Sequence, residues 1–147
     1  IPDGFHLPEP VLKSFYRAKG KDRICLVSDV ASIAGLAPGI YGKEGGLGQS
    51  ELHENGKISL AGTPYLAGAG LFLDSGIANA VRFTDASLSD AIDMVTCNPA
   101  RLLGIDDRIG TVEAGKEASL TLFRWQEEME RLDIVATVVC GEVVYRM

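Results

Sequence analysis

The sequence predicts an α/β protein followed by a small β module, on three observations along its 147 residues. Residues 7–19 carry apolar side chains at helical spacing and lead into an unbroken apolar run at 24–27, typical of a strand buried in a parallel sheet. Asn55 and Gly56 lie between two runs of alternating apolar residues, which predicts a β-hairpin. Beyond residue 109 the chain consists of short strand-like segments separated by turns. We therefore expect two parts, residues 1–108 and 109–147.

The composition is that of a globular protein and argues against two classes of partner. Hydrophobic residues make up 46% of the chain and charged residues 23%, and no apolar tract is long enough to span a membrane. The net charge is −6, whereas a nucleic-acid surface needs clustered Lys and Arg. We therefore expect no nucleic-acid and no membrane partner. Cys25, Cys97 and Cys140 are widely spaced and predict free thiols, so we expect a cytoplasmic location.

The first predicted elements are a helix at 7–19 and a strand at 24–27. Pro8 and Pro10 suit the first helical turn, where a missing N–H costs nothing, and Gly20 is a stop signal. Asp29 follows the strand at its C-terminal end, where α/β folds place catalytic groups. Two other roles remain open for Asp29, as a loop cap or as the partner of a nearby cation.

Glycines dominate the next stretch, which predicts a loop over 30–46. Residues 35–46 lack G-x-G-x-x-G and the lysine of a phosphate loop, so we interpret them as a flexible active-site loop. Strands at 47–52 and 57–60 are expected to flank the turn at 53–56, and a second loop is expected at 61–70.

Helices and then strands complete the chain. We predict helices at 71–83, at 88–96 after a capping-box start at Ser87, and at 98–103 before Gly104. Short strands are expected at 110–112 and 119–123, and a helical turn at 127–131. Residues 134–140 and 143–146 form a second hairpin candidate.

Several motifs, in this order, resemble one family. They are Asp3-Gly4-Phe5-His6, residues 26–30 (L-V-S-D-V), Leu66-Ala67-Gly68, residues 87–91, Asn98-Pro99-Ala100 and residues 110–118 (G-T-V-E-A-G-K-E-A). The first five resemble N-acetylglucosamine-6-phosphate deacetylases, and the last resembles a tail common to the amidohydrolase superfamily. The resemblance covers nearly the whole chain.

The resemblance implies a metal-dependent hydrolase with a (β/α)₈ barrel and a β-sandwich built from both chain ends. Residues 1–108 would be the C-terminal part of the barrel with a β-hairpin insertion, and residues 109–147 would be strands of the sandwich. A full barrel needs roughly 250 residues, so we interpret the sequence as a C-terminal fragment.

The implied reaction is hydrolysis of an N-acetyl amino-sugar phosphate to the amino-sugar phosphate and acetate. The resemblance assigns Asp29 as base toward the attacking water and then as acid toward the amine, with a possible role as metal ligand. It also implies that His6 and the segment Leu66, Ala67 and Gly68 bind the substrate. Asp3 is expected to cap the loop or assist His6. His53 is interpreted as an ordinary surface residue.

The implied cofactor is a divalent metal, zinc or iron, but the chain lacks a ligand set for it. A catalytic zinc takes about three protein ligands, mostly His and Glu. The sequence contains two histidines, His6 and His53, which lie far apart. The family's ligands lie upstream of these motifs, so we expect this chain alone to bind no catalytic metal and to be inactive.

Two alternative functions remain open from the sequence. The first is an amidohydrolase acting on another N-acyl compound or a cyclic amide. Ala69, Ser28 and Val30 differ from the usual family residues, which leaves the exact sugar open. The second is a noncatalytic, self-associating module. Under either reading, open strand edges predict a homo-oligomer.

Overall fold

A computed structural model describes residues 1–42 and 48–147 as a mixed α/β structure. The helices are α1 (Glu9–Lys19), the short 3₁₀ helix η1 (Lys21–Arg23), α2 (Leu73–Phe83), α3 (Leu88–Asp93) and α4 (Cys97–Leu103). The strands are β1 (Gly39–Tyr41), β2 (Ser50–Leu52), β3 (Lys57–Leu60), β4 (Leu66–Ala69), β5 (Leu120–Arg124), β6 (Asp133–Val139) and β7 (Glu142–Arg146). The predicted α/β class is confirmed.

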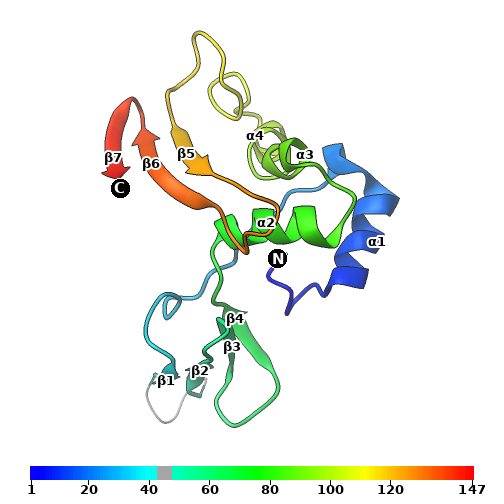
Figure 1. Cartoon of the computed structure of the whole chain (residues 1–147), viewed down its shortest axis with the longest axis vertical. Helices are drawn as coiled ribbons and strands as arrows, with labels where there is room; N and C mark the ends of the chain where they lie inside the picture. The colour runs from blue at the N-terminus through cyan, green and yellow to red at the C-terminus, as the bar shows by residue number, and fades with distance from the viewer. Residues whose placement is uncertain (43–47) are drawn as a thin grey trace.

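The described strands form two separate open sheets with all neighbours antiparallel. One sheet has the order β1-β2-β3-β4 and the other β5-β6-β7. Figure 1 shows the four-stranded sheet at one end of the molecule and the helices with the three-stranded sheet at the other. Over the described residues no barrel is closed, because each sheet ends in two edge strands.

The main core lies among α1, α2, α3 and the segment before β6. Leu12 of α1, Ile77 of α2 and Met94 after α3 are buried there, and Leu26 and Leu132 join them. Burial of such side chains stabilises the fold by about 1.5–3 kcal/mol each. The apolar faces of the helices thus fix the chain just before Asp29, through Leu26.

The helices predicted at 7–19, 71–83 and 98–103 are confirmed, the one predicted at 88–96 ends at Asp93, and local signals explain the ends. α1 starts after Pro8 and stops at Gly20. Ser87 caps α3 through a capping box with Asp90, in which each side chain bonds the backbone N–H of the other. Gly104 ends α4 in the left-handed conformation that glycine adopts most easily.

The prediction of a strand at 24–27 is wrong. These residues form no strand, and Val27 is 53% exposed. The N–H of Leu26 donates to the carbonyl of Met94, at the end of α3, at 2.9 Å. A buried parallel strand needs neighbours on both sides, and the described residues supply only a single parallel bridge, between Val30 and Ala69.

Two predicted loops contain short strands. β4 lies inside the predicted loop 61–70 and β1 inside the predicted loop 30–46. Both strands are short and pair with the strand next to them in sequence, β1 with β2 and β4 with β3, but their glycines and small residues gave little strand signal. Residues 43–46 of the predicted loop and Leu47 of the predicted strand lie outside the described residues.

Both predicted hairpins are confirmed. β2 and β3 flank residues 53–56, with Gly56 at a positive φ of 81°. β6 and β7 are joined by Cys140 and Gly141, whose positive φ values of 50° and 88° suit a tight hairpin turn. Residues 110–112 form no strand, and residues 127–131 form a turn without a helix.

None of the helices in the described part of the chain combines the length and apolar character needed to cross a membrane.

Candidate active site

The carboxylate of Asp29 is exposed, and its backbone has an uncommon conformation. Its φ is 49°, a region that few residues other than glycine adopt and that Asp tolerates better than most. Within residues 1–42 and 48–147 the side chain makes no ion pair and accepts no hydrogen bond. The alternative roles as cap or ion-pair partner therefore have no support in the described residues, and the carboxylate is available to a ligand.

The structure brings Asp29 beside the predicted substrate-binding segment in β4. The N–H of Ala69 donates to the carbonyl of Asp29 at 3.3 Å, and the N–H of Ala31 donates to the carbonyl of Ala69 at 2.8 Å. Gly68 has a φ of 98°, and a Cβ added to it would lie 2.9 Å from the Cβ of Ala31. Glycine at position 68 thus permits the close approach of β4 to the loop that carries Asp29.

His6 lies in a loop organised by a buried carboxylate. The Oδ1 of Asp3 accepts hydrogen bonds from the backbone N–H of Phe5 at 3.0 Å and of His6 at 2.8 Å. The Oδ2 of Asp3 lies 2.7 Å from the Nδ1 of His6. Asp3 therefore both caps the loop and contacts the imidazole, the two roles that the sequence suggested for it.

The N-terminal loop and the segment before Asp29 converge on the start of α2. Val27 and Ser28 line the same small hollow as Pro2 and Asp3, at the first turn of α2. The side chain of Asn79 donates to the carbonyl of Pro2 at 2.9 Å and holds the chain there. The sequence elements that carry His6 and Asp29 are thus positioned by the same helix.

The side chain of His53 contacts neighbouring residues of the β2–β3 hairpin. Its Nε2 lies 2.8 Å from the Oγ of Ser59, which is buried in β3, and its Nδ1 lies 3.9 Å from a carboxylate oxygen of Glu51. The side chain is half-buried across the β2–β3 hairpin, and more constrained than the ordinary surface residue that the sequence suggested. It is not brought to Asp29.

Asn98 ties α4 to the chain that leads to Asp29, a role that sequence reasoning missed. Its buried Nδ2 donates to the carbonyl of Lys21 at 2.6 Å and to that of Ile24 at 2.7 Å. The signal was present in the motif Asn98-Pro99-Ala100, but the two acceptors lie more than 70 residues away in sequence.

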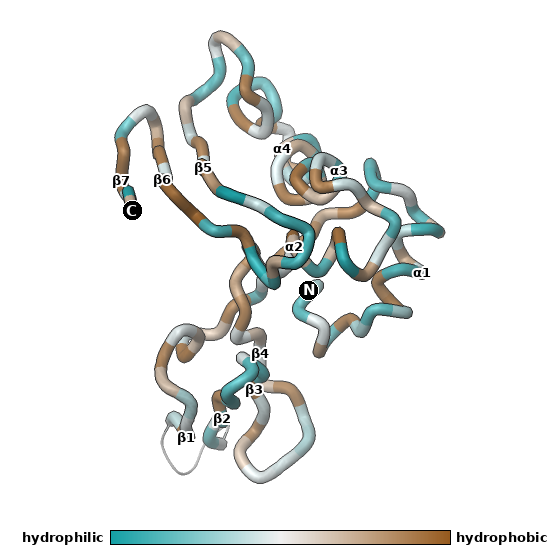
Figure 2. The backbone as a smooth tube through the Cα atoms, in the orientation of Figure 1, coloured by the Kyte–Doolittle hydropathy of each residue, from teal (hydrophilic) through white to brown (hydrophobic). Residues whose placement is uncertain are grey.

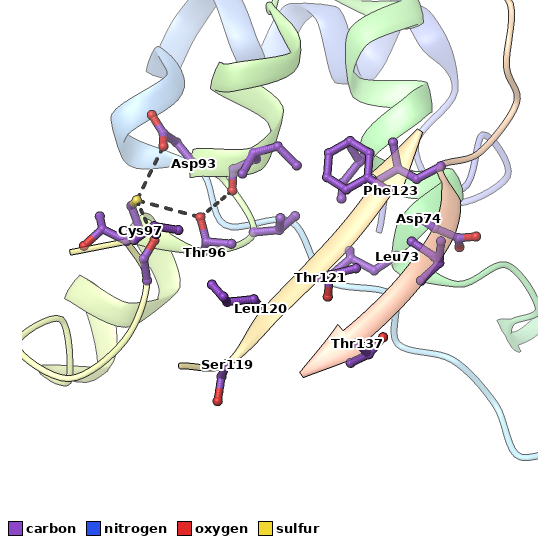
Figure 3. A pocket seen from close by; sticks show the side chains of 18 of the residues that line it. Leu73, Asp74, Asp93, Thr96, Cys97, Ser119, Leu120, Thr121, Phe123 and Thr137 are labelled. Carbon is purple, nitrogen blue, oxygen red and sulfur yellow. Dashed lines mark hydrogen bonds between the residues drawn. The ribbon is translucent and has the colours of Figure 1, made fainter. Parts of the chain in front are cut away.

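A large hollow lies between the helices and the three-stranded sheet. It has a volume of about 960 Å³ and is lined mainly by apolar side chains and threonines. Figure 3 shows Thr96 and Cys97 at the start of α4 on one wall and Leu120 and Phe123 of β5 on another. Ser28 reaches this hollow, but Asp29 and His6 do not line it. The candidate active site is therefore an open surface beside β4.

The described residues do not fit a catalytic metal. No group of three or more His, Cys, Asp or Glu side chains is arranged to hold an ion within residues 1–42 and 48–147. Asp29 could supply one ligand side chain at most, whereas a catalytic zinc takes about three protein ligands. A complete set of catalytic metal ligands is therefore not assembled by the described residues.

Comparison with known proteins places this chain in a family. The Amidohydrolase family profile matches residues 47–144. The chain is 33% identical over 142 residues to the N-acetylglucosamine-6-phosphate deacetylase of Haemophilus influenzae, covering 97% of this chain and 35% of that protein. It is 33% identical over 120 residues to a putative N-acetylgalactosamine-6-phosphate deacetylase of Escherichia coli K12, covering 82% of this chain and 69% of that protein.

The fold agrees with these relatives. The crystal structure of the N-acetylglucosamine-6-phosphate deacetylase of Thermotoga maritima matches with a TM-score of 0.84 at 33% identity, over 100% of this chain and 38% of that chain. The chain belongs to the Amidohydrolase family. It spans about a third of the length of the Haemophilus and Thermotoga deacetylases.

Proposed function

We propose that this chain is the C-terminal part of a metal-dependent amidohydrolase that removes the acetyl group from N-acetylglucosamine 6-phosphate. Residues 1–108 would be the last part of a (β/α)₈ barrel, with the β2–β3 hairpin as an insertion, and residues 109–147 would be strands of a sandwich. One observation carries the proposal: the whole chain matches the Thermotoga deacetylase with a TM-score of 0.84. In this chain Asp29 lies beside β4 with an exposed carboxylate that has no partner among residues 1–42 and 48–147.

In the proposed reaction Asp29 carries a proton. Water adds to the acetamide carbonyl carbon while its proton passes to the carboxylate of Asp29. The same proton then passes to the amine nitrogen as the C–N bond breaks, giving the amino-sugar phosphate and acetate. A carboxylate serves both steps only if it reaches solvent and the substrate, and the exposure of Asp29 supports this role.

The substrate-binding roles fall on the neighbouring segments. Leu66, Ala67 and Gly68 lie in β4, whose last residue pairs with the loop that carries Asp29. Small side chains there leave backbone groups accessible to sugar hydroxyls. His6 is proposed to contact the substrate from the N-terminal loop through Nε2.

The metal of the complete enzyme is proposed to be held by residues outside this chain. The described residues offer no set of three donors, and the chain covers about a third of its relatives. The chain alone is therefore proposed to be inactive. Purified chain that bound stoichiometric zinc and released acetate from an amino sugar would contradict this.

N-acetylgalactosamine 6-phosphate is the second candidate substrate. It is favoured by the 33% identity to the putative deacetylase of Escherichia coli, of which this chain covers 69%. The two sugars differ only in the configuration at one ring carbon, so the same Asp29 chemistry would serve either.

The test is an acetate-release assay on the complete protein that contains this chain. It compares N-acetylglucosamine 6-phosphate, N-acetylgalactosamine 6-phosphate, an unphosphorylated N-acetyl sugar and a cyclic amide. The proposal expects the highest kcat/KM for the first compound. A preference for the second would move the assignment to the alternative sugar. Activity confined to the cyclic amide would contradict the deacetylase proposal.

A further inference from the structure

The Asp3 carboxylate divides its two oxygens between the backbone and the His6 ring. Oδ1 accepts from the N–H of Phe5 and of His6, at 3.0 and 2.8 Å, and Oδ2 lies 2.7 Å from Nδ1 of His6. The Asp3 side chain is 4% exposed and the His6 side chain 23% exposed. A loop cap needs only the first oxygen, so the contact to the ring requires a separate explanation.

Asp3 is also firmly anchored. Pro2 packs on α2 at Gly76, where an added Cβ would lie 3.0 Å from the Cγ of Pro2, and the carbonyl of Pro2 accepts from Asn79 at 2.9 Å. The Asp3 carboxylate is thus held close to α2 by Pro2, the residue before it, which packs on that helix. A group held in this way can fix the orientation of a neighbouring ring.

The chemistry of the pair decides which ring nitrogen carries the proton. An ionised carboxylate only accepts hydrogen bonds, so the Nδ1 beside it must be protonated. In the neutral imidazole Nε2 is then an acceptor. Within residues 1–42 and 48–147 no hydrogen bond to Nε2 of His6 is present. The ring therefore offers one free acceptor from a fixed position.

We propose that Asp3 is a positioning residue of the active site, which holds His6 in the Nδ1–H tautomer so that Nε2 accepts a hydrogen bond from an O–H or N–H of the substrate. This rests on the proposed function, in which His6 contacts an N-acetyl amino-sugar phosphate. The partner of Nε2 is then a sugar hydroxyl or the acetamide N–H, and a neutral His6 does not donate to the acetyl carbonyl.

The test uses a substitution that separates the two roles of Asp3. In Asp3→Asn the Oδ1 still accepts from the two backbone N–H groups, but the amide nitrogen donates. Nδ1 of His6 must then accept, and the tautomer changes to Nε2–H. Long-range ¹H–¹⁵N spectra of ¹⁵N-histidine-labelled chain, at about pH 8.5 where an ordinary imidazole is neutral, distinguish the two forms.

Assignment is direct because the chain holds only His6 and His53. A His53→Gln variant identifies the His6 signals, and the His53 signals report whether Asp3→Asn preserves the fold of the hairpin. We expect the Nδ1–H form of His6 in the wild type and the Nε2–H form in Asp3→Asn. A wild-type Nε2–H form, or the same tautomer in both proteins, would overturn the proposal. If Asp3→Asn fails to fold, the wild-type spectrum still decides.

A kinetic measurement on the complete protein separates this inference from the proposed function. We expect Asp3→Asn to lower kcat/KM for the amino-sugar phosphate by about 10–100-fold, the usual effect of removing a group that orients a functional histidine. An exposed aspartate changed in the same way, Asp106→Asn, is the control. If the wild-type protein is an active deacetylase and Asp3→Asn has the same kcat/KM, the positioning role of Asp3 is overturned and the proposed function is not. A wild-type protein that deacetylates no amino sugar overturns the proposed function instead, and the tautomer result stands apart from it.

Discussion

At the scale of single residues, the conformation of the loop at Asp29 depends on a close contact with β4. Asp29 has a positive φ, and its carbonyl accepts from Ala69. Opposite it, Gly68 has no side chain where Ala31 approaches. The exposed carboxylate is thus held in place by backbone pairing, while its own side chain stays free of partners in the described residues.

Gly68→Ala tests this contact. The added Cβ would lie 2.9 Å from the Cβ of Ala31 at a φ of 98°, so both strain and overlap are expected. We expect a loss of about 2–3 kcal/mol in the free energy of unfolding, measured by urea denaturation. Gly115→Ala is the matched control, because Gly115 has a φ of 93° but nothing within 4 Å. Equal losses in the two variants would contradict a specific contact.

At the scale of elements, α4 holds the segment that leads to Asp29. Asn98 donates from α4 to the carbonyls of Lys21 and Ile24, which would otherwise lack partners as the chain passes under the helix. Among the described residues the segment 24–27 has no strand neighbours. The link from Asn98 and the hydrogen bond from Leu26 to Met94 hold it where a sheet ladder would otherwise do so.

Asn98→Ala is expected to destabilise the chain by about 2–4 kcal/mol in urea, because it removes the donors of two carbonyls. Asn55→Ala provides the comparison, since its side chain accepts one hydrogen bond at an exposed turn and its loss should cost less than about 1 kcal/mol. Similar losses for the two would show that Asn98 does not hold the segment.

The Asp90 carboxylate at the start of α3 makes part of the free energy of unfolding sensitive to acid. Hydrogen bonds from Lys21, from the Ser87 hydroxyl and from the Ser87 N–H hold the pKa of Asp90 down, from an ordinary 3.8 to about 2. Because the folded pKa lies below the unfolded pKa, this contribution is complete above pH 3.8 and is lost as the pH falls through about 2.

Asp90→Asn should therefore lower the free energy of unfolding most at neutral pH. The gap between wild type and variant should narrow as the pH falls from about 4 to about 2. Asp106→Asn, on an exposed turn, is the control for the change of side chain. A gap for Asp90→Asn that stays constant over this range would contradict the role of the ionised carboxylate.

The features that the sequence predicted correctly are those whose signals are local in the chain. The capping box at Ser87 and the turn at Asn55 and Gly56 are local, and the helix and hairpin that they mark are present. β4 was missed because its small, glycine-containing sequence resembles a loop. The strand at 24–27 was wrongly expected because an apolar run forms a strand only where neighbouring strands pair with it. The roles of Asp29 and His6 stay predictions. The support for these two roles came from the order of the motifs in the sequence, whereas the burial of the Asp3 side chain could be seen only in the structure.

At the scale of the whole molecule, the chain leaves apolar surfaces and strand edges open. β7 is an edge strand, and Val143 and Val144 on it are exposed. Figure 2 shows hydrophobic residues along much of β6. Ile134 of this strand also lines the large hollow. Surfaces of this kind favour association.

We expect the chain alone to form homo-oligomers whose mass by light scattering rises with concentration. Val144→Lys should weaken this association, because a charged residue blocks pairing at the β7 edge. Leu102→Lys, at an even more exposed apolar position on α4, should have less effect. A monomer at every concentration tested would contradict this expectation.

Asp29 is proposed to transfer the proton in an amidohydrolase of which this chain is one part. The decisive experiment measures kcat for acetate release by the complete protein with Asp29→Asn, with Asp106→Asn as the control and circular dichroism to verify folding. We expect a fall in kcat of about 10²–10⁴-fold for Asp29→Asn and no change for the control. A folded Asp29→Asn enzyme with wild-type kcat would contradict it.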